Sequence, residues 1–347
     1  MSKTTISIAG EDFQINGRLT YAGRRYRGMR IEGLLLNSRM VQGIFDDVNP
    51  NTRSNWDYPD GPWDPDRNTD AFVAAMSEWR RHGLLSFTIN LQGGNPRGYG
   101  DDQPWHNSAY EADGALRPDY MARLEKILVR ADELGMTPIV GLFYFGQDQR
   151  LADEQAVINA ADLAVDWLLQ REYAHVLIEV ANEADYRQYT HAIIQPKRGH
   201  ELIRRVQQRS QGRVSNPHKR LLVSTSFQGG SLPSDNVLEV VDFVLLHGNA
   251  VRRCEGIAKL IDDVRASAGY RGQPIVFNED DHFDFDAPDN HMLTAIDRHV
   301  SWGYFDYRMA GEPFACGYQS VPADWAINSD RKKGFFRLLA EVTSARQ

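Results

Sequence analysis

Two stretches of sequence decide the expected fold: HVLIEVANE at residues 175–183 and PIVFNE at residues 274–279. Each is a nearly continuous apolar run that ends in Asn-Glu. Such runs are typical of parallel strands that are covered on both faces. We therefore expect strands at residues 175–181 and 274–278. Six similar runs are predicted strands, at residues 31–36, 85–91, 138–145, 221–227, 242–247 and 303–308.

Amphipathic helices are predicted between the strands, at residues 69–82, 118–134, 154–170, 196–209, 255–268, 290–300 and 331–342. The second begins with Pro118 in its first turn and stops at Gly135, as helices commonly do. This alternation predicts an α/β fold, a (β/α)8 barrel that forms a single domain over residues 1–347. A doubly wound open sheet is the competing architecture, but the sequence lacks the G-x-G-x-x-G fingerprint of that fold.

Three segments lie outside this repeating pattern. Residues 1–21 alternate in polarity and turn at Asn16-Gly17, which predicts a β-hairpin packed on the barrel. Residues 46–69 and 93–116 are long polar loops after the first and second strands. They carry the aromatic residues Trp56, Trp63, Tyr99 and Trp105. Such rings either contact a ligand above the barrel or fold the loops onto it, and the sequence leaves both interpretations open.

Composition and charge exclude several classes of function. The net charge of −8 disfavours a nucleic-acid partner, because phosphate binding needs a basic surface. No apolar run approaches the ~18 residues of a membrane span, so we expect no membrane partner. Cys254 and Cys316 are too few for a disulfide framework or a thiolate zinc cluster. The opening residues lack the apolar core of a secretory signal, so we expect a cytoplasmic protein, of open oligomeric state.

Carboxylates end two of the predicted strands. In (β/α)8 barrels the active site lies at the carboxyl ends of the strands. Glu183 follows the fourth predicted strand and Glu279 the seventh. A lone Glu at such a place has a simpler interpretation, because the dipole of the next helix favours it there. A pair directed into one barrel mouth instead suits glycosidic bond cleavage, where one carboxyl protonates the leaving oxygen and the other attacks the anomeric carbon.

Asn-Glu closing the fourth strand and Glu closing the seventh resembles the pattern of clan A glycoside hydrolases, the large retaining (β/α)8 group. The resemblance covers roughly residues 31–342 and implies that Glu183 is the general acid/base and Glu279 the nucleophile. It also implies that Asn182 holds the 2-hydroxyl of the sugar. His247 ends the sixth strand in HGN, where many clan members have His followed two residues later by Tyr; here Asn249 replaces that tyrosine.

The sequence also departs from the clan pattern at the other strands. The usual arginine of the second strand is missing, and Arg39 after the first strand is the candidate substitute. Trp302 stands at the start of the eighth strand, where we expect the bottom of the barrel. The remaining candidates for substrate binding lie near the ends of their strands: Asn37, Asn90, Tyr144 and Tyr307.

The acidic segment NEDDHFDFD at residues 278–286 is a candidate metal site, because carboxylates with a histidine suit Mn²⁺, Mg²⁺ or Zn²⁺. Its spacing matches neither an EF-hand loop nor an H-E-x-x-H helix. We therefore predict no metal and no organic cofactor. Asp280 and Asp281 are expected to cap the next helix or to form an acidic lip beside a sugar site.

The sequence thus predicts a retaining β-glycoside hydrolase with a carbohydrate substrate. Because no export signal is visible, short saccharides or glycosides and exo action are expected. Two alternatives stay open: a metal-dependent sugar isomerase or epimerase on the same barrel, and a carbohydrate-binding barrel without turnover.

Overall fold

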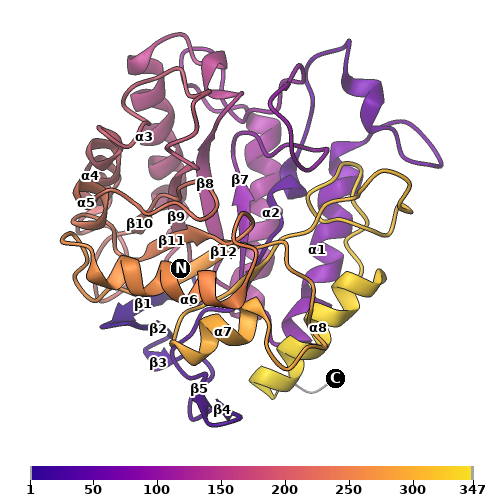
Figure 1. Ribbon diagram of the computed structural model, residues 1–347. Helices are drawn as coiled ribbons and strands as arrows, with labels where there is room; N and C mark the ends of the chain where they lie inside the picture. Colours follow the sequence, from indigo (N-terminus) through magenta and orange to yellow (C-terminus); the bar gives the residue numbers. More distant parts are fainter. Residues whose placement is uncertain (1, 345–347) are drawn as a thin grey trace.

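Eight parallel strands form a barrel surrounded by helices in the computed structural model, which describes residues 2–344 (Figure 1). The strands are β6 (Asn37–Arg39), β7 (Ser86–Asn90), β8 (Ile139–Tyr144), β9 (Leu177–Asn182), β10 (Leu222–Ser224), β11 (Val244–His247), β12 (Ile275–Glu279) and β13 (Gly303–Tyr304). Six of them form one sheet in the order β10-β9-β8-β7-β6-β13. The prediction of a (β/α)8 barrel is confirmed.

The two remaining strands close the barrel. β11 pairs with β12 in parallel, and β12 reaches β13 through the bridges Val276–Ser301 and Asp280–Tyr304. On the other side, the amide of Asp242 donates to the carbonyl of Val223 over 2.9 Å, which links the start of β11 to β10. All eight strand ends therefore open into one mouth.

The helices run between the strands much as the periodicity predicts. They are α1 (Pro65–Arg81), α2 (Pro118–Leu134), α3 (Glu154–Gln170), α4 (Gly199–Ser210), α5 (Asp235–Leu238), α6 (Cys254–Ala266), α7 (His291–Asp297) and α8 (Asp330–Thr343). α1 starts earlier than expected because Asp64 caps it, accepting hydrogen bonds from the amides of Asp66 and Arg67. α5 is a single turn, in keeping with the short link between the fifth and sixth strands.

Two predicted strands were misplaced. The first begins at Asn37, after the expected run at residues 31–36 has ended. Gly33 has a φ of 90° and the amide of Leu34 donates to the carbonyl of Ile31, so these apolar residues form a turn below the barrel. The eighth strand stops at Tyr304, short of the expected residue 308, because the chain then turns toward α8.

The N-terminal residues plug the bottom of the barrel. β1 (Ile6–Ala9), β2 (Asp12–Ile15) and β3 (Arg18–Leu19) form a small antiparallel sheet, with Asn16 and Gly17 in the second of its two turns. β4 (Arg25–Tyr26) and β5 (Met29–Arg30) follow as a hairpin, and Figure 1 shows all five below the barrel. Ile6 and Phe13 pack against the lowest interior layer of the barrel: Leu35, Leu85, Ile139, Leu177, Leu222, Phe243, Leu245 and Val276. The predicted hairpin is thus part of a three-stranded cap.

The long loops above the barrel fold around their own aromatic cluster. It comprises Phe45, Trp56, Tyr58, Trp63, Trp105 and Val321. Trp56 and Trp105 meet edge to face at 5.5 Å, and both are buried. Of the two interpretations left open by the sequence, folding of the loops therefore applies to these tryptophans. Tyr99 differs, since 49% of it is exposed.

In the part of the chain that the structure describes, no helix combines the length and the apolar character that a bilayer crossing requires.

Candidate active site

Glu183 and Glu279 meet at the mouth of the barrel. Glu183 follows β9 with a φ of 49°, a left-handed conformation that is uncommon for a residue with a side chain. Its amide donates to Oγ of Ser226 over 2.9 Å, which holds the turn. Glu279 is the last residue of β12 and pairs with His247, the last residue of β11, just after an irregularity in that ladder. The local backbone thus aims both carboxylates inward.

The two carboxylates and His247 form one compact group. One oxygen of each carboxylate and one nitrogen of His247 all lie within 4.8 Å of one another. Nδ1 of His247 is 3.0 Å from Oε1 of Glu183 and 3.7 Å from Oε2 of Glu279. His247 is buried, while Glu183 and Glu279 keep 8% and 6% exposure. The imidazole of His247 therefore lies close to both carboxylates.

Arg39 organises the floor of this group from the end of β6. Its Nε donates to Oε2 of Glu279 over 2.6 Å, and its Nη2 donates to Oδ1 of Asn182 over 2.5 Å. Its Nη1 lies 3.7 Å from Oε2 of Glu179, a fully buried residue inside β9. The guanidinium of Arg39 thus contacts residues of both β9 and β12. Its planar, forked set of donors suits it to bind two partners at once.

Asn249 completes the hold on Glu279. Its Nδ2 donates to Oε1 of Glu279 over 2.8 Å. Because Arg39 occupies the other oxygen, both oxygens of this carboxylate are held by donors. The side-chain amide of Asn249 therefore occupies the position at which the resemblance implies a tyrosine, and it contacts Glu279.

Burial and neighbouring charges shift the protonation of this group. Burial raises the pKa of Glu279 above its usual range; His247 and Arg39 counteract that rise, and the negative charges of Glu183 and Glu179 add to it. Burial would lower the pKa of His247, but Glu279 and the hydrogen-bonded Glu183 together raise it above its usual value. Shifts of this kind, produced by burial and specific partners in a cleft, are typical of reactive sites.

The remaining sequence candidates fall into two sets. Tyr144 lines the cavity beside the two acids and stacks on Phe145 with ring centres 4.3 Å apart. Asn37, Asn90 and Tyr307 do not line it. Asn37 donates to the carbonyls of Leu35 and Phe277 and so ties β6 to β12. Asn90 is buried in the barrel against Gly141.

Tyr307 supports the loop above the cavity. Its ring meets that of Tyr99 edge to face at 5.0 Å, and Gly98 approaches it so closely that a Cβ there would come within 2.4 Å of the ring. Trp302 does not line the cavity either. Its ring packs at 6.0 Å from Phe335 of α8, so it lies between the sheet and the helices.

A loop closes the cavity from above, and we refer to residues 93–103 as the cap loop. Asp101 bonds to the side chains of Tyr186 and Arg187 beyond β9. On the other side, the amide of Val321 donates to the carbonyl of Pro96 over 2.9 Å. The cavity measures about 130 Å³ and is lined by Asn95, Gly98, Tyr99, Gly100, Tyr144, Phe145, Glu183, Tyr186, Glu279, Phe305 and Gln319.

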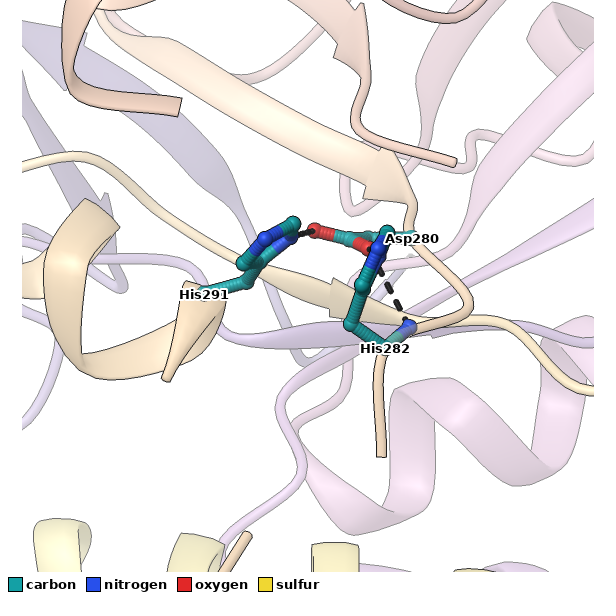
Figure 2. A group of neighbouring side chains, drawn as sticks. All are labelled: Asp280, His282 and His291. Atoms are coloured by element: carbon teal, nitrogen blue, oxygen red, sulfur yellow. Dashed lines mark hydrogen bonds and ion pairs between the residues drawn. The ribbon is translucent and has the colours of Figure 1, made fainter. Parts of the chain in front are cut away.

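Asp280 lies next to Glu279 but does not line the cavity; its carboxylate faces two histidines (Figure 2). Nδ1 of His282 is 2.6 Å from its Oδ1, and Nδ1 of His291 is 2.9 Å from its Oδ2. The indole of Trp302 also donates to Oδ2 over 2.9 Å. Burial would raise the pKa of Asp280, but the bonds from His282 and His291 hold it below its usual range.

Among residues 2–344, two groups bring metal-ligating atoms together, the Asp280 group and the Glu183–His247–Glu279 group. In the first, the histidine Nδ1 atoms are already within hydrogen-bond distance of the carboxylate, and Gly248 packs against Oδ2 of Asp280. In the second, Arg39 places a positive charge 2.6 Å from Glu279, where a cation would have to bind. Both arrangements favour hydrogen-bond networks over metal binding.

Sequence reasoning missed several residues of the site. Glu179 had a visible signal, because a charged residue inside the otherwise apolar run HVLIEVA requires a partner inside the barrel. Asn249 was noted only as a departure from the clan pattern. Tyr186, Gln319 and Asn95 reach the cavity from loops. The local sequence pattern does not predict where the side chains of such loop residues lie.

Solved structures with this fold are numerous. An endo-1,4-beta-mannanase from Rhizomucor miehei has a TM-score of 0.61 and 12% identity, covering 99% of this chain and 100% of that one. A glycoside hydrolase family 5 mannosidase from the same fungus has a TM-score of 0.56 and 13% identity, over 99% and 98% of the two chains. A family 5 glycoside hydrolase from Bacteroides vulgatus has a TM-score of 0.57 and 11% identity, over 96% and 69%.

No protein-family model and no curated protein sequence matches the chain. At sequence identities of 11–13%, this structural similarity establishes the fold alone. The chain therefore shares the (β/α)8 barrel fold of these glycoside hydrolases, the fold that the resemblance of its strand ends implied.

Proposed function

We propose that this protein is a retaining glycoside hydrolase that uses Glu279 as the nucleophile and Glu183 as the general acid/base. The observation that carries the proposal is the pair of carboxylates in one cavity, with an oxygen of each within 4.8 Å of the other. Carboxyl groups about 5–5.5 Å apart are typical of retaining enzymes, whereas inverting enzymes need about 6.5–9.5 Å to admit a water molecule. The clan A fold is consistent with this chemistry.

The contacts of the two acids support different roles. Glu279 receives one bond from the Arg39 guanidinium and one from the Asn249 amide. These donors stabilise the carboxylate anion, which is the form that attacks a carbon atom. Within residues 2–344, His247 is the one hydrogen-bond partner of the carboxylate oxygens of Glu183, and it contacts Oε1. The other oxygen is therefore available to a leaving group.

The reaction then proceeds in two displacements. An oxygen of Glu279 attacks the anomeric carbon while Glu183 transfers its proton to the glycosidic oxygen, and the bond to the leaving group breaks. Water then attacks the same carbon as Glu183 takes up its proton, which breaks the bond to Glu279 and restores both acids. Two inversions give net retention. Asn182, held by Arg39, is the candidate partner of the 2-hydroxyl.

The cap loop supports exo action on short substrates. Asp101 joins it to Arg187 over 2.7 Å, and Gln319 donates to the carbonyl of Asn95 over 3.1 Å from beyond β13. A polymer lying across the barrel mouth would have to pass through these bonds. The cavity of about 130 Å³ is also small beside the ~300–1,000 Å³ of common ligand pockets. Both features favour a single terminal sugar unit.

A panel of aryl β-glycosides tests the activity: gluco, galacto, manno, xylo, fuco and arabino. Glu183→Ala should retain hydrolysis of dinitrophenyl glycosides, whose leaving group needs no proton, and should lose about 10²–10⁴-fold with poor leaving groups. Azide added to Glu183→Ala should give a glycosyl azide of retained configuration. Azide added to Glu279→Ala should give the inverted product, because azide then replaces the nucleophile.

Glu133→Ala, on the exposed side of α2, is the matched control and should behave as wild type. Identical azide products from the two variants would contradict the assigned roles. Binding of a glycoside without release of its aglycone would point instead to a carbohydrate-binding barrel.

A further inference from the structure

The cap loop touches the nucleophile through a chain of hydrogen bonds. Nδ2 of Asn249 donates to Oε1 of Glu279 over 2.8 Å and also lies 3.0 Å from Oη of Tyr99. Oη of Tyr99 in turn donates to Oδ2 of Asp281 over 2.9 Å. Asn249 and Asp281 lie in the loops after β11 and β12, whereas Tyr99 belongs to the cap loop. The cap loop therefore bonds to the residue that orients Glu279.

The donors and acceptors in this chain fix one another. An ionised Asp281 only accepts, so the hydroxyl hydrogen of Tyr99 points to it and the oxygen is left to accept from Asn249. The two amide hydrogens of Asn249 then go to Tyr99 and to Glu279. A rotated amide would place its oxygen against the Glu279 carboxylate, where the two acceptors repel. Tyr99 thus helps to select the amide orientation that holds the nucleophile.

Closure of the cap loop supplies Tyr99 to this chain. The ring of Tyr99 is held by edge-to-face contacts with Phe305 at 5.8 Å and with Tyr307 at 5.0 Å. The cap loop lines the cavity through Tyr99 and its neighbours, so a movement of the loop would carry Tyr99 out of this chain of bonds. With Tyr99 displaced, Asn249 loses one of its two acceptors and is held by Glu279 alone. The nucleophile is then held firmly by Arg39 and more loosely by Asn249.

We propose that Tyr99 is a positioning residue that couples closure of the cap loop to the orientation of Glu279, acting through Asn249. This inference rests on the proposed function, because it gives Glu279 the role of nucleophile. Coupling of this kind delays the assembly of the reactive group until the substrate is enclosed, which is the logic of induced fit.

Tyr99→Phe removes the hydroxyl and keeps the ring. The value of kcat should fall by about 5–10-fold, the effect of one hydrogen bond, while KM changes little. In an Asn249→Ala background the same substitution should change kcat by less than about 2-fold, because Tyr99 then has nothing to position. Tyr26→Phe, which removes another tyrosine–carboxylate bond, to Glu341 below the barrel, is the matched control and should leave kcat unchanged.

Equal effects of Tyr99→Phe in the two backgrounds, or an unchanged kcat, would overturn the coupling. A crystal structure of Tyr99→Phe gives a second readout that does not depend on activity. We expect the Asn249 amide to turn away from Glu279 there. If the 2.8 Å contact persists, the inference fails even when the protein is an active glycosidase. If the contact is lost in a protein that cleaves no glycoside, the proposed function fails and the positional link stands.

Discussion

Glu279 and Asp280 are neighbours in the chain, but their carboxylates lie in two groups of opposite character. Asp280 receives the bonds of His282, His291 and Trp302 on its two oxygens, and these satisfy it. Around Glu279, within residues 2–344, the buried polar atoms that lack a hydrogen-bond partner include Nη1 of Arg39, Oε2 of Glu179, Nε2 of His247 and Oδ1 of Asn249. Similar residue types thus build one group in which the carboxylate of Asp280 is fully hydrogen-bonded, and another in which buried polar atoms near Glu279 stay unpaired.

The difference shows how to separate a reactive site from a structural network. Buried polar groups are normally paired, and unpaired ones are costly. A site that must bind a substrate or change its charge keeps such atoms available, whereas a site that only holds the fold has no reason to do so. The pairing of its atoms, more than its inventory of acids and histidines, therefore distinguishes the Glu279 group, which we propose to be reactive, from the Asp280 group. Four experiments test this difference between the Glu279 group and the Asp280 group.

The largest effect is expected at Glu279. Glu279→Ala removes the attacking atom, so turnover should fall by on the order of 10⁴–10⁶-fold, as it does when other enzymes lose their nucleophile. The unfolding temperature should fall as well, because the substitution leaves the buried Arg39 guanidinium without the carboxylate that its Nε contacts. Steady-state kinetics and thermal unfolding on the same preparation measure both. Activity within about tenfold of wild type would reject Glu279 as the nucleophile.

Asp280→Ala should act mainly on stability. It leaves three donors without their acceptor, of which His291 and Trp302 are buried, and loss of one partner from a buried ionic group costs about 3–5 kcal/mol. Because the histidines hold the pKa of Asp280 below its usual range, its contribution is present above the unfolded-state pKa and is lost as the pH falls through the lower folded-state pKa.

Urea unfolding at neutral and at acidic pH measures this contribution. The difference in free energy of unfolding between wild type and Asp280→Ala should shrink at acidic pH. Asp286→Ala, an exposed carboxylate whose side chain is 89% accessible, is the control. Equal stability of Asp280→Ala and wild type at neutral pH would contradict a structural role.

Glu179→Gln should move the pH profile. The negative charge of Glu179 contributes to the raised pKa of Glu279, so its removal should lower that pKa. Activity requires ionised Glu279, and the acidic limb of kcat/KM should therefore shift to lower pH. Glu125→Gln, which removes a surface charge paired with Arg171, should leave the limb in place. An acidic limb that does not move would show that Glu179 only balances Arg39.

The smallest effect is expected from metal removal. Exhaustive dialysis against EDTA should change neither turnover nor the unfolding temperature, because hydrogen bonds already satisfy the Asp280 group. Elemental analysis and activity before and after dialysis test this expectation. Loss of activity that Mn²⁺, Mg²⁺ or Zn²⁺ restores would favour the isomerase alternative.

The sequence was informative where a strand fixes the direction of a side chain. The apolar runs and their helices predicted the barrel, and the strand ends brought Glu183, Glu279 and His247 to one mouth. Arg39 was expected to replace a missing arginine, and it does contact both Asn182 and Glu279.

The sequence was less informative where long-range contacts decide the outcome. The run at residues 31–36 is apolar enough for a strand, but Gly33 turns it, and a positive φ is not visible in a hydrophobic pattern. Asn37 begins β6 instead of following a strand, and Tyr307 lies beyond the end of β13; their side chains bond to or pack on the protein itself. The cap loop is held by bonds between residues about 85 positions apart, such as Tyr186 and Asp101, and local sequence does not encode these.

The plug at the barrel bottom has a consequence for the order of folding. Ile6 and Phe13 rest on side chains that arrive as late as Val276, and the amide of Ile8 meets His218, which lies 210 residues further along the chain. These residues therefore leave the ribosome well before many of the side chains on which they pack. Contacts of such high sequence separation slow folding. During synthesis the small N-terminal sheet can pair its own strands early, but it cannot complete its packing against the barrel until Val276 has been made.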